Sequence, residues 1–208
     1  MVIDLYSIGY AGFCIKDFID LLKCNDIKAV IDVRSIPYSK YYSDYNENKL
    51  QELLGKHNIY YRNYAKEFGA QQKDRRYYSD EGFLDFERFT ASEIFISGFN
   101  KIKTSMEKNY TFVLMCSEKD PLECHRSIMV SRIFYTNGYR IKHLLNNGSI
   151  ITQEDIENRL LNEYFPDRET HYQLSLFDKS TISTEELIAE AYRKKNSEIG
   201  YRLLEVKH

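Results

Sequence analysis

The sequence predicts an α/β fold in which a parallel sheet of four or five strands carries helices on both faces, in a Rossmann-like three-layer arrangement. Short apolar runs alternate with amphipathic stretches over the first 145 residues, which is the order of strands and helices in such folds. The run at residues 27–33 is almost entirely apolar, as expected of a strand buried on both faces. With 208 residues, of which 43% are hydrophobic, the chain is long enough to build this core.

Apolar runs and capping residues define the expected elements in order. The expected strands cover residues 3–8, 27–33, 59–61, 110–115 and 139–144. The expected helices cover residues 15–24, 47–56, 83–108, 123–137 and 184–206. Asn137-Gly138 is a typical helix end, and Ser183 with Glu186 forms a capping box at a helix start. The basic, tyrosine-rich segment 62–82 has no clear period, which predicts a long functional loop.

The pattern divides the chain into an α/β domain at residues 1–146 and a C-terminal extension at residues 147–208 that ends in a helix. No apolar run reaches the roughly 18 residues of a membrane span, so we expect no membrane association. The N-terminus has an early acid, Asp4, and no basic region, which predicts a cytoplasmic protein with reduced thiols. A balance of 29 Lys and Arg against 31 Asp and Glu does not by itself indicate nucleic-acid binding.

Polar loops follow three of the expected strands, and parallel sheets bind ligands outside the carboxyl ends of their strands. These loops cover residues 7–12, 32–40 and 116–126. In the third loop, Cys116 ends a strand and Cys124 opens a helix, whose N-terminus would hold anions and lower the pKa of a thiol. Arg34 and Arg126 offer guanidinium groups for phosphate or carboxylate.

The three loops together provide the candidate site residues. The candidate catalytic residues are Cys116, Glu118, Cys124 and His125, and the candidate ligand-binding residues are Gly9, Asp32, Arg34, Ser39, Tyr41 and Arg126. Each group also has a structural interpretation, because thiols pack in cores, His125 can orient its loop, and Asp32 can pair with Arg34.

We expect no metal ion and no cofactor. The spacing of Cys116, Cys124 and His125 matches no zinc knuckle or ribbon, and an adjacent Cys-His pair rarely binds one ion in a closed site. A tyrosine-phosphatase-like loop requires Cys-x5-Arg, whereas Cys116 and Arg126 are ten residues apart.

Tyrosines alternate with Lys and Arg between residues 38 and 78. Aromatic rings stack on bases while cations neutralise phosphate, so this composition suits a single-stranded nucleic acid or a flipped base. Tyrosines also fill the edges of cores with their hydroxyls in water, and the sequence leaves both interpretations open.

Taken together, these loops resemble a known family. The segments that carry the resemblance are Ser7-Ile8-Gly9-Tyr10, Ile31-Asp32-Val33-Arg34-Ser35-Ile36-Pro37-Tyr38-Ser39, Phe68-Gly69, and residues 114–126, which read LMCSEKDPLECHR. Over residues 3–146 the chain is similar to the domain-of-unknown-function 488 family, which implies an α/β domain without an established activity. The motif positions are Asp32, Arg34, Pro37, Ser39, Cys116, Glu118, Cys124, His125 and Arg126. The chain departs from the family at Phe68-Gly69-Ala70, where Leu-Gly-Gly is more usual, and at Ser117, where Ala is.

A second resemblance lies in the C-terminal extension. The pentapeptide at residues 173–177, Gln-Leu-Ser-Leu-Phe, resembles the peptide by which bacterial polymerases and repair proteins bind the sliding clamp. The resemblance implies the clamp as a partner, contacted by Gln173, Leu174, Leu176 and Phe177. The same apolar residues could instead pack on the protein's own core.

Three functional hypotheses follow. In the first, the protein is an enzyme on nucleotides or nucleic acid, with Cys116 as nucleophile and His125 or Glu118 transferring protons. In the second, it is a non-enzymatic adaptor that binds nucleic acid or protein and is tethered to the clamp. In the third, Cys116 and Cys124 serve a small-molecule or redox enzyme through a reversible disulfide.

Overall fold

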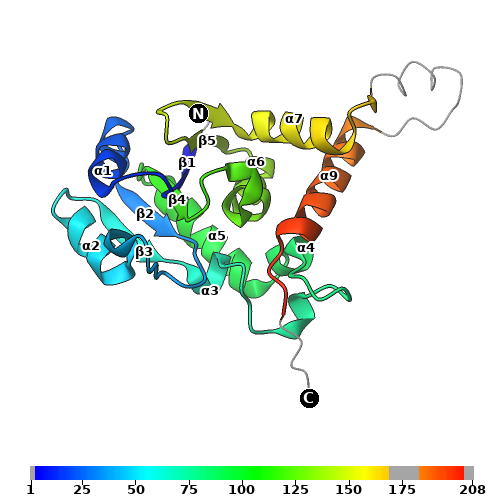
Figure 1. Cartoon of the computed structure of the whole chain (residues 1–208), viewed down its shortest axis with the longest axis horizontal. Helices are drawn as coiled ribbons and strands as arrows, with labels where there is room; N and C mark the ends of the chain where they lie inside the picture. Colours follow the sequence, from blue (N-terminus) through cyan, green and yellow to red (C-terminus); the bar gives the residue numbers. More distant parts are fainter. Residues whose placement is uncertain (1–2, 169–182, 204–208) are drawn as a thin grey trace, which may run out of the picture.

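A computed structural model describes residues 3–168 and 183–203, which form an α/β fold around a six-stranded sheet (Figure 1). The strands are β1 (Asp4–Gly9), β2 (Ala29–Asp32), β3 (Tyr60–Asn63), β4 (Phe112–Cys116), β5 (Arg140–Leu144) and β6 (Ile150–Thr152), in the order β3-β2-β4-β1-β5-β6. The first five strands are parallel, as predicted. The sixth was not predicted: β6 is a three-residue antiparallel edge strand on β5, too short to give a pattern in the sequence.

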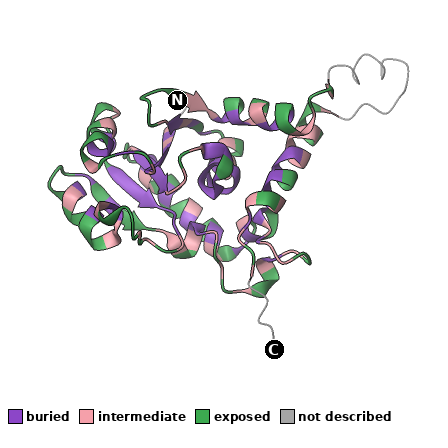
Figure 2. Cartoon of the chain, in the orientation of Figure 1, coloured by how far each residue is buried: buried purple, intermediate pink, exposed green. Residues whose placement is uncertain are grey.

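The helices occupy both faces of the sheet. They are α1 (Ile15–Cys24), α2 (Glu47–Gly55), α3 (Ala65–Phe68), α4 (Phe86–Thr90), α5 (Glu93–Met106), α6 (Arg132–Thr136), α7 (Gln153–Tyr164) and α9 (Thr184–Ile199). Alternate strand residues face opposite sides: Val30 and Val113 pack with α1 and α2, whereas Ile31 and Leu114 pack with α5, α6, α7 and α9. The central strands β2 and β4 are therefore buried on both faces (Figure 2), which explains their continuous apolar runs.

Several predicted boundaries were wrong for local reasons. The single helix expected at residues 83–108 is two helices, because Asp85 caps α4 and Ser92 caps α5. The loop expected at residues 62–82 contains the end of β3, the short helix α3 and a 3₁₀ turn at Arg75–Tyr77. The helix expected at residues 123–137 begins as a π-helical segment, Arg126–Ser131, before α6.

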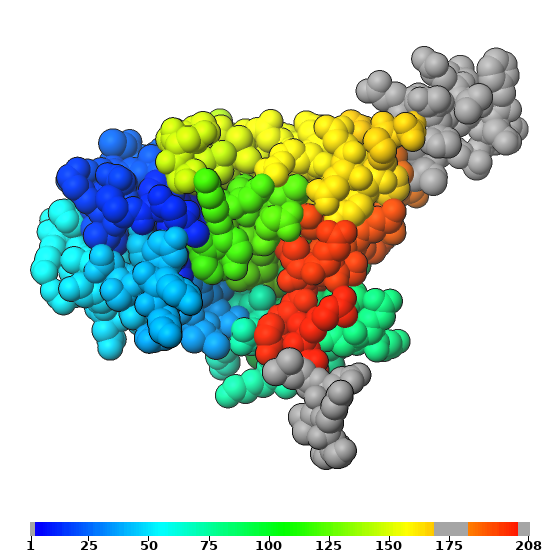
Figure 3. Space-filling view, viewed as in Figure 1, coloured from blue at the N-terminus to red at the C-terminus, as the bar shows by residue number. Residues whose placement is uncertain are grey.

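The C-terminal extension packs on the rest of the fold. Both of its helices begin with a capping box, Thr152 with Asp155 on α7 and Ser183 with Glu186 on α9. The last helix ends at Ile199 rather than near residue 206, because Gly200 has extended torsion angles (φ −60°, ψ 130°). The Leu84 N–H donates to the Tyr201 carbonyl at 2.9 Å, so residues 201–203 lie against residues 82–84 (Figure 3). Within the described ranges, no helix is both long and apolar enough to cross a bilayer.

Candidate functional site

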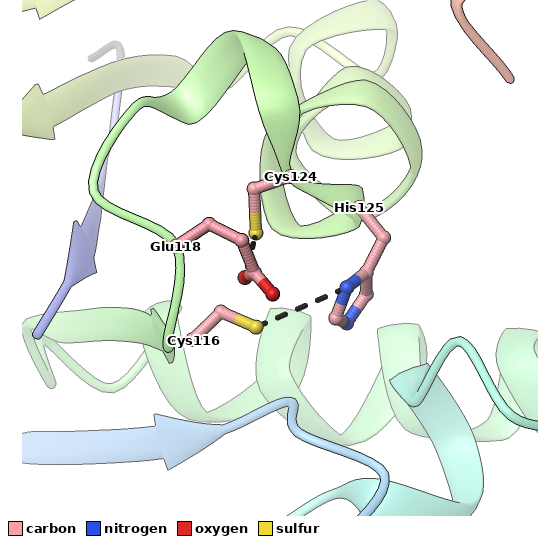
Figure 4. A group of neighbouring side chains, drawn as sticks. All are labelled: Cys116, Glu118, Cys124 and His125. Atoms are coloured by element: carbon pink, nitrogen blue, oxygen red, sulfur yellow. Dashed lines mark hydrogen bonds between the residues drawn. The ribbon is translucent and has the colours of Figure 1, made fainter. Parts of the chain in front are cut away.

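Four side chains with metal-ligating or catalytic chemistry meet after β4, at the carboxyl edge of the sheet (Figure 4). They are Cys116, Glu118, Cys124 and His125, and we call them the Cys-Glu-Cys-His cluster. One donor atom from each lies within 4.8 Å of all the others. The structure therefore brings together the four residues that the sequence proposed as catalytic.

The loop between Cys116 and Cys124 folds back because Asp120 starts a tight turn. The Asp120 carboxylate accepts the Leu122 N–H at 2.9 Å and opens a 3₁₀ turn at Pro121–Glu123. This turn returns the chain to the end of β4, so Cys124 and His125 face Cys116 and Glu118.

Hydrogen bonds fix the orientation of the cluster. The Cys124 thiol donates to Glu118 Oε2 at 2.9 Å, and Cys116 Sγ lies 3.9 Å from His125 Nδ1. The other ring nitrogen of His125, Nε2, lies 2.9 Å from the carbonyl oxygen of Val33. Because a carbonyl only accepts, Nε2 carries a hydrogen and Nδ1 is the nitrogen presented to the cluster.

Charges and hydrogen bonds within the cluster lower the pKa values of two of its members and raise that of a third. Burial raises the pKa of Glu118, but the charge of His125 and hydrogen bonds from both thiols lower it to about 2. Burial likewise raises the pKa of Cys124, yet the hydrogen bond from Cys116 and the charge of Arg126 lower it to about 6. Burial and the Cys124 neighbour raise the pKa of Cys116 well above its ordinary value. The first proton is therefore lost from this pair of thiols more readily at Cys124 than at Cys116.

A pocket of about 280 Å³ opens over this cluster. Its floor includes Cys116, Glu118 and His125, whereas Cys124 lies behind them and does not line it. Arg34 lines the same pocket, together with Tyr10, Ser35, Tyr38, Gln71 and Tyr201. Of the last five, only Tyr38 was anticipated, as one of the tyrosines expected to stack on a base. Tyr10 and Tyr38 stand beside motif residues in the sequence, but nothing there marks Tyr201.

Asp32 holds Arg34 at the pocket wall. Both residues are buried, and the Arg34 Nε donates to the two carboxylate oxygens of Asp32 at 2.9 and 3.0 Å. Arg34 Nη2 donates to Asp32 and to the Tyr45 carbonyl, whereas Nη1 has no hydrogen-bond partner among the described residues. Arg34 therefore combines a fixed orientation with an unused donor.

Arg126 has a different environment from the one expected. Its side chain is fully buried, and its Nη1 donates to the Glu118 carbonyl at 2.6 Å. Its Nη2 donates to the Lys119 carbonyl, so the guanidinium binds the main chain of the loop after β4 at two carbonyl groups. Gly9 completes this support, because a Cβ there would stand 1.7 Å from the Glu118 carbonyl oxygen. Ligand binding by Arg126 and Gly9 stays a prediction, and their geometry favours a scaffold.

Of the six predicted ligand-binding residues only Arg34 lines the pocket, and Ser39 and Tyr41 lie outside the lining together with Gly9, Asp32 and Arg126. The Ser39 hydroxyl accepts the Tyr42 N–H and shapes the turn before α2, and Tyr41 is 88% exposed. The tyrosines between residues 38 and 78 also differ in burial, since Tyr45 and Tyr61 are buried while Tyr38 and Tyr60 are exposed. The clamp-like peptide with Gln173, Leu174, Leu176 and Phe177 lies outside the described residues.

Comparisons with known proteins agree with the motif resemblance. No curated protein and no solved structure matches the chain. A family model, described as "Domain of unknown function DUF488", matches residues 14–133, which is more than half of the chain and includes the whole Cys-Glu-Cys-His cluster. The chain therefore belongs to the DUF488 family.

Proposed function

We propose that the protein is an enzyme that binds a phosphate-bearing nucleotide unit in the pocket and acts on it with the Cys-Glu-Cys-His cluster. The observation that carries this proposal is that Arg34 and three members of the cluster line one pocket of about 280 Å³. That volume is near the lower end for small-ligand sites, so it suits one nucleotide, free or at the end of a strand, rather than a duplex.

Arg34 is the group best suited to hold the phosphate. Guanidinium groups bind phosphate through paired N–H donors, and Arg34 has one Nη without a partner in the described ranges. Asp32 binds the opposite side of the guanidinium, so little side-chain freedom is lost when a ligand binds.

The remaining lining supplies proton transfer and stacking. Glu118 and His125 place a carboxylate and an imidazole in the pocket lining, and these groups serve either in acid–base catalysis or as metal ligands. Tyr10, Tyr38 and Tyr201 provide aromatic surface against which a base can stack.

The test is binding of a panel of nucleoside monophosphates and a short single-stranded oligonucleotide, measured by isothermal titration calorimetry. Tyr38→Ala should weaken binding about 5- to 150-fold, as expected for loss of a stacking ring. Tyr41→Ala is the matched control, because Tyr41 is an exposed tyrosine of the same segment outside the pocket lining.

Arg34→Lys should weaken binding about tenfold or more, since lysine cannot reproduce the guanidinium fork. Arg76→Lys is its control, because Arg76 pairs with Asp74 in the same way but lies exposed, away from the pocket. Absence of binding across the panel, or binding that neither pocket variant changes, would overturn the proposal.

A tether to the sliding clamp is a second, separate proposal, supported by the pentapeptide at residues 173–177. Wild-type protein should retain purified bacterial clamp in a pull-down, and a variant with Leu176→Ala and Phe177→Ala should not. If the clamp is never retained, the tether is wrong, whatever the result of the nucleotide titration.

A further inference from the structure

We infer that the Cys-Glu-Cys-His cluster binds a divalent metal ion of the zinc class, so that the reacting centre of the pocket is a metal centre. A catalytic role for this metal ion rests on the proposed function, but metal binding itself can be measured without any nucleotide. The sequence predicted no metal, and the convergence of four donors is the new observation.

The donor set has the chemistry of a zinc site. Two sulfurs, one imidazole nitrogen and one carboxylate oxygen are the atoms that bind zinc in proteins, usually as a tetrahedron. With metal–ligand bonds of about 2.0–2.3 Å, a tetrahedron places donor atoms about 3.3–3.8 Å apart. The four donors here already lie within 4.8 Å of one another, so small side-chain rotations are enough to close the site.

Neighbouring residues hydrogen-bond to the donor side chains and orient them, as the residues around the ligands do in known metal sites. A histidine ligand usually donates its other ring N–H to a carboxylate or a backbone carbonyl. His125 does this through Nε2 to Val33, which directs Nδ1 at the cluster. The Ser117 hydroxyl donates to Glu118 Oε1, and Arg126 holds the main chain of Glu118.

The backbone explains how adjacent residues serve one site. Cys124 has extended torsion angles (φ −138°, ψ 132°), whereas His125 is helical (φ −58°, ψ −24°). This change of conformation between neighbours lets both side chains point to the same place, as Figure 4 shows. The usual objection to an adjacent Cys-His pair therefore does not apply at this turn.

The position of the cluster indicates a working site rather than a structural one. Structural zinc sites are closed, whereas catalytic ones keep a coordination position for water or substrate. Three of the four donors line the pocket, and Glu118 is the least buried of the four. Exchange of the Glu118 carboxylate for a ligand atom would give the pocket direct access to the metal.

Without a metal, the pocket offers little positive charge to an anionic ligand. Arg34 is the only lysine or arginine among the described residues that line it, and Asp32 already offsets its charge. Glu118 and Glu123 also line the pocket, and their carboxylates would repel a phosphate. The charge of a zinc dication is offset by the two protons that the thiols release on binding it, so what a phosphate gains is a Lewis-acidic cation within reach of the pocket.

The experiment uses the full chain, purified without a metal-binding tag under reducing conditions. We expect about one zinc per chain by elemental mass spectrometry, and cobalt(II) added to the metal-free protein should give the thiolate-to-cobalt absorption of a tetrahedral sulfur site. Cys116→Ser and Cys124→Ser should each weaken metal binding about 100-fold or more. Cys14→Ser and Cys24→Ser are matched controls, because those thiols are exposed and outside the cluster.

The outcomes separate the two proposals. Failure of the wild-type chain to bind zinc or cobalt would overturn the metal site, even if nucleotides bind. Metal binding that survives both cluster substitutions would also overturn it, as would a Cys116–Cys124 disulfide forming in place of a metal complex. Metal binding without nucleotide binding would leave the metal site standing and refute the proposed function.

Discussion

Asp32 and Arg34 form an ion pair that is almost completely removed from solvent, with exposed fractions of 0% and 4%. The Asp32 carboxylate accepts the Arg34 main-chain N–H and its guanidinium, and it also accepts the Tyr61 hydroxyl at 2.7 Å. The same arrangement, two residues apart, recurs at Asp74 and Arg76 on the surface. The two pairs differ in burial and not in geometry.

Asp32→Ala should therefore lower the free energy of unfolding by about 3–5 kcal/mol, because it leaves the Arg34 charge buried without a partner. Urea denaturation followed by circular dichroism measures this change. Asp74→Ala removes the equivalent carboxylate in water and should leave the unfolding midpoint almost unchanged. Equal effects of the two substitutions would contradict the structural role of the buried pair.

Gly9→Ala should destabilise the protein by several kcal/mol or displace the loop after β4, because the new Cβ would overlap the Glu118 carbonyl. Thermal unfolding and the metal titration report the two effects. Gly55→Ala is the matched control: at that helix end a Cβ meets nothing within 4 Å, so the variant should be as stable as wild type or slightly more stable. A stable Gly9→Ala variant with intact metal binding would show that the loop is not held as described.

Acid should destabilise the protein through His143. This residue is fully buried between Ser7 and Gln153, and burial together with the charge of Arg126 lowers its pKa from 6.5 to about 3. A lowered pKa means that the unfolded chain binds the proton more tightly, so stability is full above pH 6.5 and falls as the pH decreases toward 3. Between pH 7 and pH 5 this residue should contribute a loss of about 2 kcal/mol.

The measurement compares urea unfolding of wild type and His143→Gln at both pH values. The variant should be less stable at pH 7, because it loses shape and hydrogen bonds in the core, but it should lose less stability on acidification. Parallel pH profiles for the two proteins would refute the assignment.

The four thiols should react in a fixed order with an alkylating reagent. Cys14 and Cys24 are exposed and should react in the native state, whereas Cys116 and Cys124 are buried. In the metal-free protein, access decides the order: Cys116 borders the pocket and should react first, whereas Cys124, although its pKa is the lower, reacts only when the loop opens. Peptide mass spectrometry over time gives the order, and early modification of Cys124 would show that the loop opens readily.

The sequence predicted the fold well where a signal was local. The apolar runs of β2 and β4 identify strands that are buried on both faces, because no polar face is required. The strand β6 was missed because three residues cannot show a period. The π-helical start of the helix after Cys124 was missed because it depends on a tertiary contact: Arg126 is buried there and supports the Glu118 carbonyl.

The candidate site was predictable in its members and less so in their roles. The rule that parallel strands end at one edge was enough to group Cys116, Cys124 and Arg34. It could not tell that Arg126 faces main-chain carbonyls instead of the pocket, because the path of the loop decides this. It also could not find Tyr201, whose position depends on a pairing with Leu84 across more than half of the chain.

That pairing divides the pocket between two parts of the chain. The region shared with the family ends at residue 133 and contains every donor of the cluster, whereas Ile199 and Tyr201 come from beyond it and line the same pocket. A chain truncated after α7 would keep the Cys-Glu-Cys-His cluster but lose Ile199 and Tyr201 from the pocket lining. The reacting residues and the residues that select the ligand can therefore evolve independently. Substitutions in the C-terminal extension would change which molecules fit the pocket and leave the reacting residues unchanged.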